Sequence, residues 1–193
     1  MSPKDSYAAL EHCSSVLRRV TVSMEDESMD WLVLPDAKSI GEIFLHMAAF
    51  EFLMISAIKR KAGKEIDHEL WQQLKAGFSR EAGFDPPAGI SKEDYFELID
   101  VVRMKTRAFF EERDWEPKVP RENVDIAGLA QELALKDTEV DPSVYDRLRK
   151  GVGTSFVDDG AVLEGDSVDM HEILRLHETY HRGQITFQKY LRA

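Results

Sequence analysis

Five residues near the C-terminal end of the sequence have the types and the spacing of a metal-binding motif. Residues 177–181 read His-Glu-Thr-Tyr-His, the H-E-x-x-H pattern in which two histidines bind zinc and the glutamate is the general base of a peptidase. Residues four apart on a helix share one face, so His177 and His181 are expected to point the same way. A metal site built on these two histidines needs a third ligand from elsewhere in the chain.

The order of the candidate ligands argues against a peptidase. Peptidases with this motif take their third ligand from downstream, yet the segment after His181 holds no His, Asp or Glu. A third ligand must therefore lie upstream of the motif, which is the reverse of the ligand order in these peptidases. Glu178 is then expected on the wet face of its helix, with Arg175 and Lys189, in an ion pair with Arg182.

His46 is the upstream candidate. It lies within the apolar run 43–58, and a buried imidazole without a partner is costly. One interpretation is a core histidine hydrogen-bonded to a backbone carbonyl. The other is a third ligand beside His177 and His181, because three neutral imidazoles suit Zn²⁺, Ni²⁺ or another late divalent metal.

Four long helices are predicted to position these residues, so the fold class is all-α. Hydrophobic periodicity indicates helices over 5–24, 40–61, 91–113 and from about 166 to the C-terminus. Capping boxes, Ser39 with Glu42 and Ser91 with Asp94, mark two of the starts. No phosphate-binding loop, repeat or strand–helix alternation is seen. We therefore expect a single domain, 1–193, built as a four-helix bundle.

Residues 115–165 form a long excursion between the third and fourth helices, expected as an insertion or a lid-like segment. "DIAGLAQELALK" and "DPSVYDRLRKG" are read as helices, and the stretch from 151 as a loop or short hairpin. Connections of this length are often lids or binding loops; a decorative surface insertion is the alternative. If the segment is a lid, Tyr145 or Phe156 is expected to reach the pocket. Replacing 121–162 with a linker is then expected to leave folding intact.

Composition disfavours several classes of function. The 193 residues are 43% hydrophobic, enough for one real core. A net charge of −11 argues against nucleic acid. The run 43–58 contains His46 and Glu51 and is shorter than the roughly 20 residues of a membrane span. The lone Cys13 and the absence of an apolar leader lead us to expect a cytoplasmic protein.

Two stretches in this order, "SIGEIFLHMAAFE" (39–51) and "HETYHRGQI" (177–185), resemble the DinB-like superfamily. The tryptophan of "MDWLVLPDAK" also resembles that family, and the likeness covers about 1–61, 91–114 and 166–193. It implies a four-helix bundle whose metal ligands map to His46, His177 and His181, followed by Arg182, Gly183 and Gln184.

The resemblance also implies a range of functions. It suggests a metal-dependent hydrolase, or a transferase that joins a low-molecular-weight thiol to an electrophile, with zinc or nickel, a small-molecule substrate and a homodimer. The alternative is a non-catalytic, stress-linked dimeric bundle whose metal is structural or vestigial. An apolar surface on the second helix, Phe44, Phe52, Ile55 and Ile58, is expected at the dimer interface.

The remaining candidates have modest expected roles. Tyr180 and Gln184 are predicted to line the site, and Gly183 to allow close helix approach beside it. Three other side chains are expected elsewhere: Glu51 paired with a base on another helix, His171 solvated and His68 outside the pocket. Cys13 is expected to be a small core residue.

Overall fold

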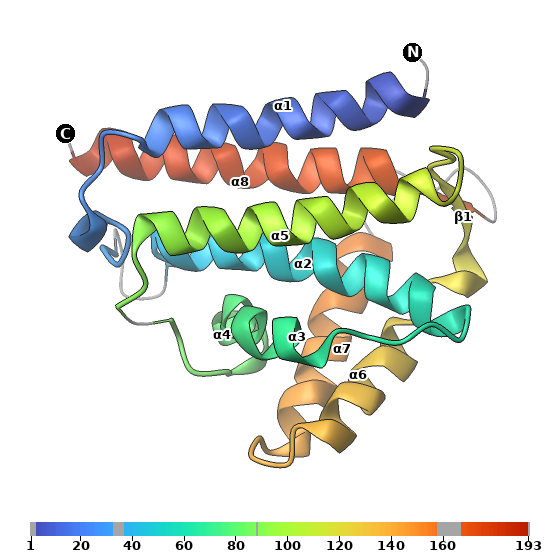
Figure 1. Ribbon diagram of the computed structural model, residues 1–193. Coiled ribbons are helices and arrows are strands. Elements are labelled where there is room, and N and C mark those ends of the chain that lie inside the picture. Colours follow the sequence, from blue (N-terminus) through green and yellow to red (C-terminus); the bar gives the residue numbers. More distant parts are fainter. Residues whose placement is uncertain (1–2, 33–36, 88, 158–166, 193) are drawn as a thin grey trace.

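The structure, a computed structural model, describes residues 3–32, 37–87, 89–157 and 167–192, except for the side chains of residues 3, 6, 13, 151–157 and 192. In these ranges the chain is all-α apart from one short strand pair. Four long helices lie alongside one another (Figure 1): α1 (Pro3–Thr21), α2 (Ile40–Lys61), α5 (Lys92–Glu111) and α8 (Met170–Arg192). A 3₁₀ turn, η1 (Asp26–Ser28), follows α1.

Both predicted capping boxes are confirmed. At the start of α2, the Ser39 hydroxyl accepts from the Glu42 amide at 3.1 Å, and the Glu42 carboxylate accepts from the Ser39 amide at 2.7 Å. Ser91 and Asp94 make the same exchange at the start of α5. Each box satisfies two backbone amides that a helix start otherwise leaves unpaired, and a capping side chain contributes about 1 kcal/mol.

Helix α2 is the centre of the molecule and is buried from Ile40 to Ile58. It packs against α5, α8 and α6 and against the short helices that follow it. Phe44, Phe52, Ile55 and Ile58 are each at most 5% exposed, so the apolar surface expected to meet a second subunit does not exist. The segments after α2 and α5 cover it, and the dimer remains a prediction from the resemblance alone. By length and composition α2 could cross a membrane, but its apolar window lies wholly inside the protein.

A short ladder fixes the start of α8. Strand β1 (Lys118–Pro120) pairs antiparallel with β2 (Ser167–Asp169), with Val119 opposite Val168. The predicted last helix therefore begins at Met170, three residues after the strand starts, rather than near 166. Because β1 follows α5 closely, this ladder anchors the N-terminal end of α8 to the end of α5.

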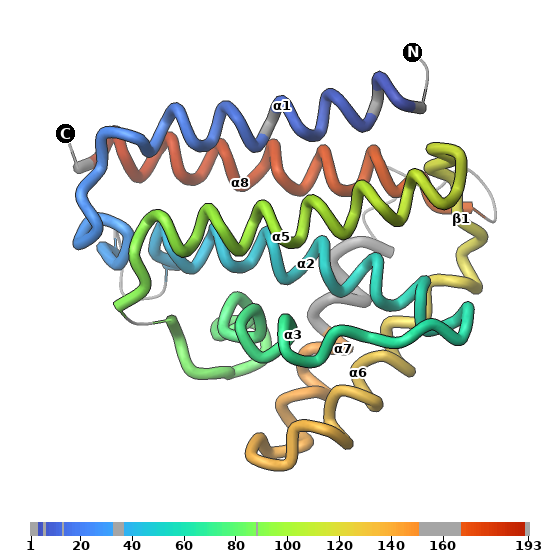
Figure 2. Tube along the Cα trace, viewed as in Figure 1, coloured from blue at the N-terminus to red at the C-terminus, as the bar shows by residue number. Residues whose placement is uncertain are grey.

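Residues 121–157 add helices to the core. After η3 (Arg121–Asn123), helices α6 (Ile126–Lys136) and α7 (Pro142–Val157) form a hairpin below α2, seen in Figure 2. Helix α6 packs against α2, and α7 packs against α4 (Ser79–Ala82). Hydrogen bonds also join this part of the chain to α3 (His68–Leu74) and η2 (Lys75–Phe78). Leu129, Leu133 and Leu148 are at most 1% exposed. The described part of the expected lid is therefore core structure.

Tyr145 shows how this hairpin is held. The Trp71 indole donates to the Tyr145 hydroxyl at 3.2 Å, and that hydroxyl donates to Asp137 at 2.8 Å. Tyr145 thus packs on α3 and does not approach the histidines, contrary to expectation. The backbone of residues 151–157 is helical, where a loop or hairpin was predicted. The Phe156 side chain and residues 158–166 lie outside the described part of the chain.

Candidate metal centre

Three histidines from two helices meet between α2 and α8. The Nε2 atom of His177 is 3.3 Å from Nε2 of His46 and 3.1 Å from Nε2 of His181. The ligand nitrogens of all three lie within 4.8 Å of one another. Two nitrogens on one tetrahedral zinc, at Zn–N distances of about 2.0–2.1 Å, are about 3.3 Å apart. The two shorter separations therefore match a shared metal ion.

Hydrogen bonds on the far side of two rings set their tautomers. His46 Nδ1 donates to the Gly77 carbonyl at 3.0 Å, and His181 Nδ1 donates to Gln184 Oε1 at 2.7 Å. Those oxygens can only accept, so the proton sits on Nδ1 and Nε2 keeps its lone pair. Metal-binding histidines are typically held by partners of this kind.

Gln184 and Tyr180 lie beside the cluster as predicted. The Gln184 amide donates through Nε2 to the Tyr180 hydroxyl at 3.1 Å, which fixes Oε1 toward His181. The Tyr180 ring also packs edge-on against His181, with ring centroids 5.0 Å apart. The orientation of one candidate ligand therefore depends on two neighbours on its own helix.

Gly77 is a site residue that sequence reasoning missed. A Cβ atom there would lie 2.6 Å from the backbone carbonyl group of Leu45 and 2.7 Å from the His46 amide nitrogen. Only glycine permits this approach of η2 to α2, which brings the Gly77 carbonyl to His46. The signal in the sequence was a lone Gly in an apolar stretch, and nothing local indicated which helix it would touch.

Burial keeps the three imidazoles neutral. Each histidine is 6–7% exposed, and Phe50 packs against His177 with ring centroids 4.1 Å apart. Burial, with a smaller contribution from nearby Lys38, lowers the pKa of His46 and His177 well below the ordinary value and that of His181 to about 4. Neutral imidazole is the form that binds a metal, so the cluster is ready for one at neutral pH.

Glu178 is buried, which corrects the expected ion pair with Arg182. Its carboxylate accepts from the Ser14 hydroxyl at 2.8 Å and lies 3.1 Å from Nη2 of Arg103 on α5. The same nitrogen is 3.0 Å from Glu51, so the predicted pairing of Glu51 with a base on another helix is confirmed. Glu178 therefore joins α8 to α1 and α5 instead of serving as a base beside the histidines.

The orientation of α8 about its own axis accounts for the buried position of Glu178. The helix turns Glu178 inward and leaves the Tyr180 side chain 64% exposed and the Phe187 side chain 60% exposed. Gly183 is also exposed, and a Cβ atom added there would have no neighbouring atom within 4 Å, so it serves no close helix approach within the described chain.

Two further histidines lie apart from the cluster. His171 is 1% exposed between Tyr7 and Phe110, and neither ring nitrogen has a hydrogen-bond partner among the described residues. The expectation that it is solvated is wrong. His68 lies on α3 with its Nε2 3.6 Å from Glu132, outside the cluster as expected. The Cys13 side chain is outside the described part.

The ligand count suggests what such a centre can do. Within the described side chains the cluster comprises three histidines and no fourth protein ligand. Zinc takes four ligands, and a site with three protein ligands has room for water or a substrate atom. Comparison of the chain with protein-family models, curated proteins and solved structures gives no match.

Proposed function

We propose that the protein is a cytoplasmic, homodimeric, metal-dependent enzyme of the DinB-like superfamily. His46, His177 and His181 would hold a divalent metal, zinc or nickel, and the substrate would be a small molecule. The reaction is hydrolysis or transfer of a low-molecular-weight thiol to an electrophile. The observation that carries the proposal is the convergence of three Nε2 atoms with Nε2 separations of 3.1 and 3.3 Å.

The chain's own groups supply orientation and exclude water. Gly77 and Gln184 hold two of the rings, and Phe50 and Phe78 cover the cluster on its apolar side. A bound metal supplies Lewis-acid chemistry: it polarises a carbonyl, activates water or favours a thiolate over a thiol. Glu178 would not serve as the general base, because its two oxygens are engaged by Ser14 and Arg103.

Metal analysis tests the site directly. Purified protein is expected to hold one divalent metal per chain by elemental mass spectrometry. His46→Ala, His177→Ala and His181→Ala should each abolish stoichiometric metal, whereas His68→Ala should retain it because His68 lies outside the cluster. Full metal content in His46→Ala would exclude the site between α2 and α8.

Activity tests the proposed chemistry. Metal-loaded protein is assayed with glutathione or cysteine and an aryl halide, and separately with activated esters. Either S–C bond formation with release of the halide and a proton, or ester hydrolysis, should disappear in His177→Ala. Casein is expected to remain intact. Casein cleavage that is lost in Glu178→Gln would instead establish the protein as a peptidase.

A structural metal site is the second candidate, favoured by the low exposure of the three rings. Cobalt substitution separates the two, because a catalytic site has an exchangeable ligand. Azide or a thiol should change the visible spectrum of the cobalt protein if a coordination position is open. An unchanged spectrum, together with a large rise in Tm on metal binding, would identify the metal as structural.

A further inference from the structure

A second concave site lies on another side of α2. A cavity of about 150 Å³ opens between α2, α5 and the segment that precedes α3. Phe52, Ile55 and Lys59 of α2 line it, and the 100° advance per residue puts them on the opposite side of the helix from His46. None of the three clustered histidines lines this cavity.

The floor of the cavity is apolar. It is formed by Phe52, Ile55, Ile66 and Val102, each at most 5% exposed. A lined cavity of about 150 Å³ is large enough to take up a benzene-sized molecule. The floor therefore has room for an aromatic ring or a branched aliphatic chain, which would remove apolar surface from water.

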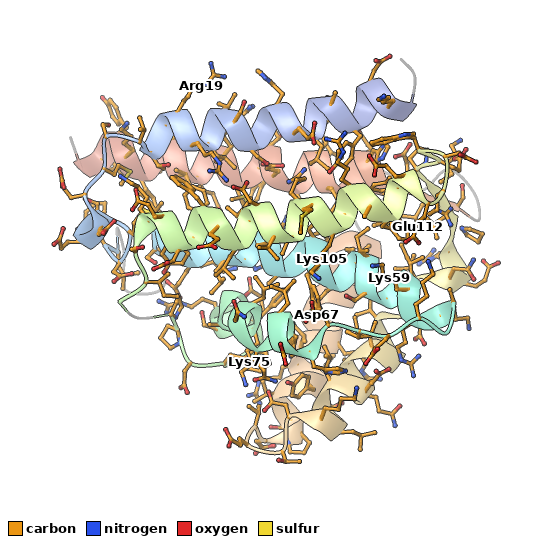
Figure 3. The ribbon with its side chains drawn as sticks, viewed as in Figure 1. Arg19, Lys59, Asp67, Lys75, Lys105 and Glu112 are labelled. Carbon is orange, nitrogen blue, oxygen red and sulfur yellow. The ribbon has the colours of Figure 1, made fainter. Side chains whose placement is uncertain are left out.

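The walls and rim carry two hydroxyls, two lysines and two carboxylates, those of Glu65 and Asp67. Ser56 and Thr106 line the cavity, and neither hydroxyl has a hydrogen-bond partner in the described chain. At the rim, Lys105 is paired with Asp67 at 2.8 Å. Figure 3 shows Lys59, Lys105 and Asp67 on one side of the molecule, where α5, α2 and the start of α3 meet.

Lys59 is the cation that the protein leaves available. Within the described residues no carboxylate lies within 4.0 Å of its ammonium group. Burial lowers the pKa of Lys59, with Lys64 and Lys105 adding to the effect against the opposing influence of Glu112 and Asp67. An anion bound at the rim would offset this cost, since an opposite charge stabilises the ammonium form.

We propose that this cavity binds a small organic acid. Its carboxylate meets Lys59 and accepts hydrogen bonds from Ser56 and Thr106, and its ring or branched chain occupies the apolar floor. The hydroxyls and the ammonium group are the donors that a carboxylate needs, and charge-assisted hydrogen bonds are the stronger kind. A phosphate-rich ligand would leave the apolar floor uncovered.

Benzoate is the probe, and backbone NMR of the full-length protein is the measurement. Saturable shifts are expected at Ser56, Ile66 and Thr106, with benzamide, the neutral isostere, bound about tenfold more weakly or worse because it lacks the charge. The titration is run with and without bound metal. Equal benzoate affinity in both samples is expected, because the histidines lie on the other side of α2.

Two variants locate the charge. Lys59→Met keeps the aliphatic stem and should weaken benzoate binding about tenfold or more. Lys61→Met, a matched change of an exposed lysine at the end of α2 that does not line the cavity, should leave the affinity unchanged. The proposal is overturned if benzoate gives no saturable shift at about 10 mM, if benzamide binds equally well, or if the shifts require metal. Loss of metal binding elsewhere would not affect this test.

Discussion

Arg103 is the only cation that contacts the two buried carboxylates of Glu51 and Glu178 within the described chain, so Arg103→Met should be strongly destabilising. Its Nη2 atom lies 3.0 and 3.1 Å from the two carboxylates. The side chains of Arg103, Glu51 and Glu178 are 12%, 7% and 6% exposed. Methionine keeps the volume and removes the charge, so the effect measures electrostatics more than packing.

The magnitude follows from what the carboxylates can do once the guanidinium is gone. Breaking a buried pair by removing one partner costs about 3–5 kcal/mol. One carboxyl can instead take up a proton, which at pH 7.5 costs about 4 kcal/mol for a group with a pKa near 4.3. Both routes give about 4 kcal/mol, a large part of the stability of an ordinary domain.

The penalty should shrink in acid. Burial raises the pKa of Glu178, against the lowering influence of Arg103. A carboxyl with a raised pKa binds protons more tightly in the folded state than in the unfolded chain, so falling pH favours folding through this group. At pH 5.5 the protonation cost is only about 1.6 kcal/mol. The loss of stability in Arg103→Met should therefore fall to about 2 kcal/mol.

Urea unfolding followed by circular dichroism at the two pH values measures this. Arg107→Met, on the exposed face of the same helix, is the control and should leave the midpoint unchanged. The double substitution Glu51→Gln with Glu178→Gln in the Arg103→Met background should restore most of the stability, because no charge is left buried. The reasoning fails if Arg103→Met loses less than about 1 kcal/mol at pH 7.5, or loses the same amount at both pH values.

Three further predictions concern other features. Gly77→Ala should cost about 1–3 kcal/mol of stability and about 10–100-fold in metal affinity, because its Cβ collides with the α2 backbone. The control is Gly183→Ala at an exposed position, compared in the same unfolding measurement and metal titration, and it should stabilise the fold slightly. Burial lowers the pKa of His171 despite the opposing charges of Asp169 and Glu116, so the folded state resists its protonation and stability is lost as pH falls below about 6.5. His171→Leu should raise the free energy of unfolding at pH 5.5 by about 1–3 kcal/mol, and an unchanged pH profile would contradict this. Replacing 121–162 with a Gly/Ser linker should now prevent folding, seen as lost dispersion in the NMR spectrum, because Leu129 and Leu133 belong to the core.

The elements that the sequence predicted well are those with local causes. Ser39 and Glu42 cap α2 within four residues of chain, so its start at Ile40 was predicted without knowledge of the fold. His177 and His181 share a face through helix geometry alone. His46 could be matched to them because a histidine amid apolar residues needs a partner that the helix itself does not supply.

The errors arose where a distant partner decides the outcome. Glu178 was expected in water, but Arg103, 75 positions away, and Ser14, 164 positions away, stabilise it inside. These contacts set the rotation of α8 about its own axis, which leaves Tyr180 exposed and His171 buried. Likewise the apolar sides of α2 looked surplus to a four-helix bundle, because the hairpin of α6 and α7 that covers them has weak periodicity.

The candidate ligands lie far apart along the chain, which has a consequence for biosynthesis. His46 precedes His177 by 131 residues, and at about 5–20 residues per second a ribosome needs roughly 7–26 seconds to bridge that interval. During that time α2 exists without the helix that completes the cluster, and its apolar surface needs α5 and the α6–α7 hairpin as cover. A metal that depends on all three histidines can be loaded only after α8 has been released and docked. Chains that end before α8 would bind no metal at this site, so metal content would report the fraction of chains that include α8.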